Sequence, residues 1–404
     1  MLLGRLIPLL TRTGLIALSG FLTLPALISV LGAGPWSVVA VGQAIGAIAS
    51  VILLYGWSVT GPAQVAAGGV VGARVAVVES RRVRGVLAAP VLGLVGIFAW
   101  LTMSEHWALF YVGFLSMALV GFGNVWYYVG GGGLWRLLVL DGLPRASANL
   151  GAVAVLLTGQ PGLAGLALIA SGAGIASLAT QVDSAISSGK SLSLAQVAQA
   201  SREIRGFPAI VRSEAGAAGA SLVGSLYGTM PLVIYTVLGF PSLPLFAFMD
   251  KVAKQSLTGL APLVTAMQGW VPSSSLAETQ RRANQSRWLT MVAGILIGIL
   301  VGSISGPIFR WLGAGEIPYD LATGAALAGL IAASFVELSL GRSYVVPLGN
   351  VHLLSRVTSW GSILGIGLML AGASTLGAAA AIGGLAIGQM LKAMAYLVWG
   401  NRRR

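Results

Sequence analysis

The stretch from Trp288 to Ile308 reads WLTMVAGILIGILVGSISGPI and contains no charged residue. About 20 mostly apolar residues in a helix cross the roughly 30 Å hydrocarbon core of a bilayer, so this stretch is typical of a transmembrane helix. The same pattern recurs along the chain and predicts twelve spans in all. They lie at 6–30, 35–57, 85–102, 107–127, 137–157, 162–181, 213–236, 244–268, 288–308, 321–340, 355–373 and 377–398.

The composition of the chain agrees with a membrane protein. Of its 404 residues, 56% are hydrophobic and only 9% are charged, against about 25% charged in a typical soluble domain. So few charges cannot cover a soluble surface, and so much apolar mass excludes a disordered chain. We therefore predict an all-α polytopic membrane protein with about twelve transmembrane helices in two six-helix bundles.

The charge distribution predicts how the chain is oriented. With both termini on the cytoplasmic side, the inner segments hold nearly all arginines and lysines, including Arg402–Arg404, whereas the outer loops hold only Arg310. This is the positive-inside pattern of a multi-pass protein of the cell membrane. It also accounts for the net charge of +13 without a nucleic-acid partner.

The segment 58–80 is the ambiguous part of this topology, because it is apolar enough for a further span. A crossing here would place Arg81, Arg82 and Arg84 outside and reverse every later loop. We therefore predict a cytoplasmic extension or an interfacial helix for 58–80.

A weak internal repeat divides the chain into two halves. Val30-Leu31-Gly32 ends the first predicted span, and Val237-Leu238-Gly239 ends the seventh, 207 residues later. Six spans on each side give both halves the same orientation, as in a parallel repeat. The predicted organisation is an N-terminal bundle at 1–181, a cytoplasmic connector at 182–212 and a C-terminal bundle at 213–404.

Motifs for enzymatic chemistry are missing from the sequence. There is no cysteine, and the two histidines, His106 and His352, are far apart, which leaves no pattern for a metal site or a hydrolase triad. Gly189-Lys190-Ser191 resembles the end of an ATP-binding loop, but Ser184 occupies the position of its first glycine. We predict a protein that is not an enzyme and that has no cofactor.

Charges inside the predicted spans are the informative residues, because each costs several kcal/mol in the membrane unless it is satisfied. Arg12 lies well inside the first span, and Asp250, Lys251 and Lys254 lie in the eighth, with Lys254 roughly 16 Å from the start of that span. Asp250 and Lys254 are i,i+4 neighbours, so they can form a purely structural pair. A role in contacting substrate is the alternative.

Several motifs are similar to those of the polysaccharide (Wzx-type) flippases, a family of the multidrug/oligosaccharidyl-lipid/polysaccharide exporter (MOP) superfamily. The motifs are Pro25-Ala26-Leu27-Ile28-Ser29-Val30-Leu31-Gly32, Tyr55-Gly56-Trp57-Ser58-Val59-Thr60, Gln64-Val65-Ala66, Trp126-Tyr127-Tyr128-Val129-Gly130, and Met249-Asp250-Lys251-Val252 with Pro262-Leu263-Val264-Thr265-Ala266. They cover most of the first half and spans seven and eight.

The resemblance implies two bundles that face a central cavity. It also implies a substrate, an oligosaccharide joined through diphosphate to a polyprenol, which is moved from the inner to the outer leaflet. Arg12, Lys251 and Lys254 would then be candidate contacts for the diphosphate, and Asp250 would restrain Lys254. Membrane lipids and a polysaccharide polymerase or glycosyltransferase complex are the partners that fit this function. A cation-coupled multidrug exporter or a lipid II flippase of the same fold is the alternative.

Overall fold

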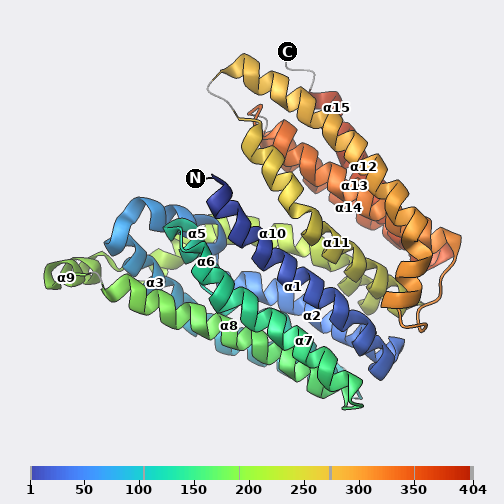
Figure 1. The fold of residues 1–404 in the computed structure, drawn as a ribbon, viewed down its shortest axis with the longest axis horizontal. Helices are drawn as coiled ribbons and strands as arrows, with labels where there is room; N and C mark the ends of the chain where they lie inside the picture. The colour runs from blue at the N-terminus through green and yellow to red at the C-terminus, as the bar shows by residue number, and fades with distance from the viewer. Residues whose placement is uncertain (1, 103–104, 191, 273–274, 350, 401–404) are drawn as a thin grey trace. The chain divides into compact units, whose positions relative to one another are not determined.

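The computed structural model describes residues 2–102, 105–190, 192–272, 275–349 and 351–400, and in this part of the chain the regular structure is helical (Figure 1). Residues 402–404, whose arginines contributed to the predicted orientation, lie outside the described residues. The α-helices are α1 (Leu2–Leu31), α2 (Ala33–Leu54), α3 (Trp57–Thr102), α4 (Trp107–Ala118), α5 (Val125–Gly131), α6 (Leu134–Leu137), α7 (Leu143–Leu157), α8 (Gly162–Lys190), α9 (Leu194–Glu203), α10 (Phe207–Val237), α11 (Leu243–Trp270), α12 (Leu276–Leu312), α13 (Leu321–Leu340), α14 (Val351–Leu376) and α15 (Ala378–Gly400).

These helices make the chain an all-α polytopic membrane protein, as the sequence predicted. Among the described residues, eight helical stretches are long and apolar enough to cross a membrane, or nine with α10, which bends by 54° after Leu226. One of the eight, Ala33–Leu101, contains both α2 and most of α3, which the sequence predicts as two separate crossings. The remaining predicted spans lie on α7, which is short, and on α11, which carries three charges.

The segment 58–80 is helical and belongs to the same element as the third predicted span. The prediction separated 58–80 from the span 85–102, whereas both belong to α3, which extends from Trp57 to Thr102. Gly69 bends it, with φ 56° and ψ −150°, a backbone conformation that is essentially restricted to glycine. The helix therefore has an early arm, Trp57–Gly68, and a late arm, Val70–Thr102.

The chain divides into two compact units, Met1–Val233 and Ile234–Arg404. The predicted connector at 182–212 is helical at both ends. α8 continues to Lys190, and α10 already begins at Phe207. The first turns of α10 pack against α3, so they belong to the first unit.

The two glycines of the sequence repeat have the same backbone role in the two halves. Gly32 directly follows α1 with φ 78°, and Gly239 follows α10 with φ 66°. Positive φ after a helix is the usual position for glycine, because other residues clash there. The sequence similarity at the ends of spans one and seven thus corresponds to a shared way of ending a helix.

Candidate functional site

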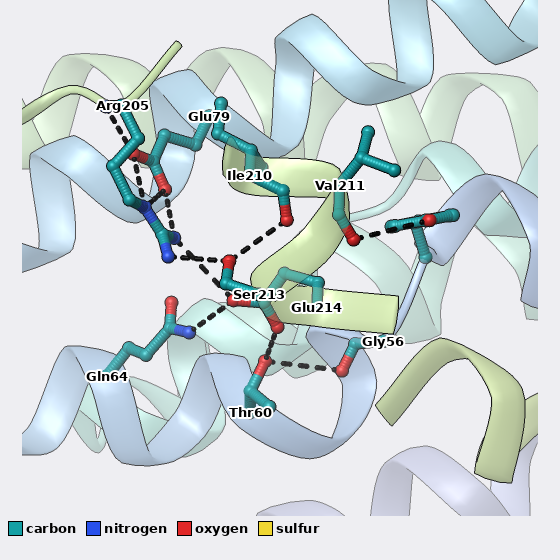
Figure 2. A network of polar contacts seen from close by, with 10 residues as sticks. Gly56, Thr60, Gln64, Glu79, Arg205, Ile210, Val211, Ser213 and Glu214 are labelled. Carbon is teal, nitrogen blue, oxygen red and sulfur yellow. Dashed lines mark hydrogen bonds and ion pairs between the residues drawn. The ribbon is translucent and has the colours of Figure 1, made fainter. Parts of the chain in front are cut away.

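A buried polar network lies where both arms of α3 meet the segment that leads into α10 (Figure 2). The turn between α2 and α3 brings these elements together, with φ 43° at Tyr55 and φ 87° at Gly56. A Cβ atom on Gly56 would lie within 2.9 to 3.1 Å of Ala218 N, Ala217 Cβ and Glu214 O. Glycine is therefore needed for α10 to approach so closely, and Tyr55 adds a hydrogen bond to the Val211 carbonyl at 3.4 Å.

The centre of the network is an ion pair between Glu79, on the late arm of α3, and Arg205, just before α10. The backbone N of Arg205 donates to Glu79 Oε1 at 2.8 Å, and its Nη2 donates to Oε2 at 2.5 Å. Glu79 is only 1% exposed. The hydrogen bonds to Glu79 raise the pKa of Arg205, since they favour its charged form. Arg205 therefore stays cationic throughout the physiological range.

A second buried carboxylate, Glu214 on α10, shares the same arginine. Its Oε1 lies 3.6 Å from Arg205 Nη2, and it accepts hydrogen bonds from Thr60 Oγ1 at 2.7 Å and from Gln64 Nε2 at 3.0 Å. Thr60 and Gln64 come from the early arm of α3 (Figure 2). The network thus holds two carboxylates and one cation, and it ties both arms of α3 to the start of α10.

Aromatic residues form the apolar support of this network. Trp57, Trp126 and Ile210 belong to one buried cluster. The close approach of α5 to α3 depends on glycine, because a Cβ on Gly61 would lie 2.5 Å from the Trp126 ring and one on Gly130 would clash with Pro62. The aromatic motif that follows the fourth span therefore packs against the early arm of α3.

A buried arginine, Arg84, lies further along α3. It is 1% exposed, and its Nη1 donates to the Phe122 carbonyl at 2.6 Å and to Asn124 Oδ1 at 2.7 Å. The Asn124 amide in turn donates to Ser184 Oγ on α8 at 2.7 Å. Arg84 thus binds neutral oxygens at the break between α4 and α5, where a 3-10 turn replaces the α-helix.

Arg12, the predicted site residue of the first span, is paired in the structure. Its Nε and Nη2 lie 2.6 and 2.5 Å from Asp141 Oδ2, and Arg145 Nη1 lies 3.8 Å from the same oxygen. Asp141 is 2% exposed and belongs to a π-helical turn, Leu138–Gly142, before α7. Two arginines therefore surround one buried carboxylate in the first unit.

The other predicted site residues lie on α11 in the second unit. Lys254 Nζ is 2.5 Å from Asp250 Oδ2, which is the i,i+4 pair considered from the sequence. Lys251 is half-buried on the same helix. The structure thus brings Asp250 and Lys254 together, whereas Arg12 belongs to the other compact unit and has its own carboxylate.

Sequence reasoning missed Glu79, Arg205, Glu214, Asp141 and Arg145 as site residues. A signal for the surroundings of Glu214 was present, since Thr60 and Gln64, which donate hydrogen bonds to it, lie in the stretches that carry the resemblance. Asp141 had no such signal, because its partner Arg12 is 129 residues away in the sequence. Among the described residues, no group of three or more acidic residues or histidines could hold a metal ion.

The fold defined by these helices is that of MATE family transporters. An inward-facing multidrug resistance transporter of this family, in the MOP superfamily, has a TM-score of 0.65 at 12% identity, over 99% of this chain and 94% of that one. A MATE protein in complex with MaL6 gives a TM-score of 0.61 at 12% identity, over 99% and 95% of the two chains.

A third solved structure is a MOP superfamily transporter from Pyrococcus furiosus with a binding pocket of reversed polarity. It has a TM-score of 0.58 at 11% identity, over 99% of this chain and 94% of that one. No family model matches the sequence, and no curated protein is similar to it. The chain therefore shares the fold of the MOP superfamily.

Proposed function

We propose that this protein is a flippase that moves a polyprenyl-diphosphate-linked oligosaccharide from the inner to the outer leaflet for cell-surface polysaccharide synthesis. The observation that carries the proposal is an excess of cations around two buried carboxylates, Asp141 and Asp250. Arg12 and Arg145 surround Asp141, and α11 has two lysines beside Asp250. Each cluster thus contains two cations and one carboxylate. This charge balance suits an anionic substrate group rather than a cationic drug.

The chemistry of a diphosphate fits such clusters. A diphosphate loses hydration inside the membrane, and cationic donors have to replace that water. Arginine contacts phosphate in a bidentate manner, whereas lysine acts as a point charge. Asp141 and Asp250 would weaken the binding enough for release on the far side. Within this fold, the transporter from Pyrococcus furiosus has a binding pocket of reversed polarity, which suggests a different function for that protein.

A cation-coupled multidrug exporter is the second candidate, and one observation favours it. Glu79 and Glu214 share the single cation Arg205, so this network has one carboxylate in excess. A cationic drug or a coupling cation needs such a group. A lipid II flippase is a variant of the first candidate, with another glycan on the same diphosphate.

Purified protein in liposomes tests the proposal directly. We expect transfer of a fluorescent polyprenyl-diphosphate oligosaccharide between leaflets, and we expect Arg12→Ala and Lys254→Ala to slow it about tenfold at unchanged abundance, since each removes a charge-assisted hydrogen bond. Lys254→Arg should keep most of the transfer, as should Arg310→Gln, which removes an exposed arginine elsewhere. Efflux of cationic dyes without leaflet transfer would favour the multidrug exporter instead.

The double variants separate a substrate contact from a structural pair. If Lys254 serves only to neutralise Asp250, then Asp250→Ala with Lys254→Ala should restore transfer. The same holds for Asp141→Ala with Arg12→Ala. Recovery in both double variants would refute the assignment of these cations to the substrate, while leaving a flippase function intact.

A further inference from the structure

A groove of about 540 Å³ lies between α14 and α15 in the second unit. Its lining is mostly apolar, and it combines one exposed arginine, one buried lysine and seven other side chains or glycines. The lining residues are Arg356, Val357, Trp360, Gly361, Ile363, Leu364, Leu391, Lys392 and Ala395. The volume is within the range of small-molecule sites.

The groove exists because small residues hold the two helices close together. Ala380, Gly384 and Gly388 recur every four residues along α15 and meet Gly372, Leu368 and Gly365 of α14. Such rows let helix backbones touch in membranes. The next position in the row is Lys392, whose stem lies against Gly361. The floor of the groove is therefore made by glycine, alanine and the stem of Lys392, and the larger lining side chains form its walls.

Along α14, the residues that line the groove match the successive parts of a phospholipid, from the headgroup to the acyl chain. Arg356 is exposed at one end, Trp360 follows one turn later at 71% exposure, and Ile363 and Leu364 follow at 63% and 48%. Tryptophan prefers the headgroup level of the bilayer, and aliphatic residues prefer the hydrocarbon. Charge, aromatic ring and aliphatic wall thus succeed one another over about 12 Å.

The charges of the groove select the headgroup. Arg356 has no carboxylate within ion-pair distance among the described residues, and the nine lining residues include no acid. Lys392 is directed away from the groove, since its Nζ lies 3.8 Å from Glu337 Oε1 on α13. The accessible charge at the groove is therefore that of Arg356, which would attract an anion. Basic pockets between transmembrane helices commonly bind acidic lipid headgroups.

From this arrangement we infer a binding site for an anionic phospholipid between α14 and α15. Its phosphate contacts Arg356, its glycerol region lies beside Trp360, and one acyl chain follows Ile363 and Leu364 over the floor at Gly361. This lipid is a component of the surrounding membrane, so the site is independent of the transported substrate and of the function proposed above.

Quenching of Trp360 by brominated lipids tests this site. The protein has 11 tryptophans, so the signal of Trp360 is the difference between the unmodified protein and Trp360→Phe. In vesicles of phosphatidylcholine with added phosphatidylglycerol, we expect brominated phosphatidylglycerol to quench this signal with about fivefold preference over brominated phosphatidylcholine. This factor corresponds to about 1 kcal/mol for one basic residue near an acidic surface. Arg356→Gln should reduce the preference to about one, while Arg310→Gln should leave it unchanged.

Two further variants keep the test decisive if Arg356→Gln is poorly folded. Arg356→Lys keeps the charge and should retain most of the preference. Ala395→Leu fills the floor of the groove and should lower quenching of Trp360 by brominated phosphatidylglycerol about as far as Arg356→Gln does. Equal quenching by the two lipids in the unmodified protein would overturn the inference, as would a preference that persists in Arg356→Gln.

Discussion

Arg205 holds two buried carboxylates from a position outside the helices, where the chain enters α10. Its strongest contacts are to Glu79, and Glu214 lies at the longer distance of 3.6 Å. The arginine side chain is itself 37% exposed, so water screens part of its attraction. Removing it would nevertheless leave Glu79 buried without a charged partner, which is the costly case for an ion pair.

A double-mutant cycle between Glu79 and Arg205 measures this contact. We expect Glu79→Gln and Arg205→Gln each to lower the thermal unfolding temperature of the purified protein. The double variant should lose less stability than the sum of the two single losses. The difference corresponds to a coupling free energy of about 1 kcal/mol. Arg202, an exposed arginine on α9, provides the control. In a cycle of Glu79→Gln with Arg202→Gln, the two losses of unfolding temperature should add up. Additive losses in the Glu79 and Arg205 cycle would contradict the pair.

The pH dependence of that coupling follows from the raised pKa of Arg205. A raised pKa adds stability that is fully present below the unfolded-state pKa of the group and is lost only as pH rises through the folded-state pKa. Both values lie in the strongly alkaline range for arginine. Deprotonation of Arg205 should therefore not weaken the coupling between pH 6 and pH 9.

At the scale of elements, α3 carries both the bend and most of the polar network. Thr60 and Gln64 lie before Gly69, and Glu79 lies after it. A Cβ on Gly69 would meet no atom within 4 Å, and the same is true of Gly68. Only the backbone distinguishes these neighbours, because Gly69 has φ 56° and the helix contains no other non-helical residue.

Alanine substitutions at these two glycines should therefore affect stability differently. Gly69→Ala should destabilise the protein by about 1–3 kcal/mol, since alanine is strained at that backbone conformation. Gly68→Ala should be neutral or stabilising by about 1 kcal/mol, since alanine favours a helix over glycine. Thermal unfolding of both variants decides the matter. Equal effects of the two substitutions would mean that the bend at Gly69 does not constrain the chain.

The same helix shows what the sequence can and cannot predict. Hydropathy correctly placed a helix at every predicted span, and the bounds 321–340 agree with α13. The link between 58–80 and 85–102 was not predicted, because Arg81, Arg82 and Arg84 make the middle of α3 look like a boundary. Two of these arginines in fact donate hydrogen bonds to distant carbonyls, Arg81 to Gln181 and Arg84 to Phe122. Such long-range partners have no local signature in a single sequence.

At the scale of the whole molecule, the proposed flippase function makes transport sensitive to the membrane potential. For such a flippase, the energy can come from the substrate gradient, from ions or from the membrane potential. The diphosphate of the proposed substrate carries about two negative charges. A potential that is negative inside favours outward movement by about 2.3 kcal/mol per charge for each 100 mV.

The response of transfer to a membrane potential therefore measures the net charge that moves. In proteoliposomes with a potassium gradient and valinomycin, transfer of the lipid-linked oligosaccharide toward the positive side should be faster than at zero potential. The charges on Arg12 and Lys254 oppose this effect if they travel with the substrate, so Lys254→Gln should increase the voltage dependence of whatever transfer remains. Liposomes with the ionophore but no protein provide the background rate. Slower transfer toward the positive side would show that the protein moves net positive charge with its substrate, and net outward movement of negative charge would then be refuted.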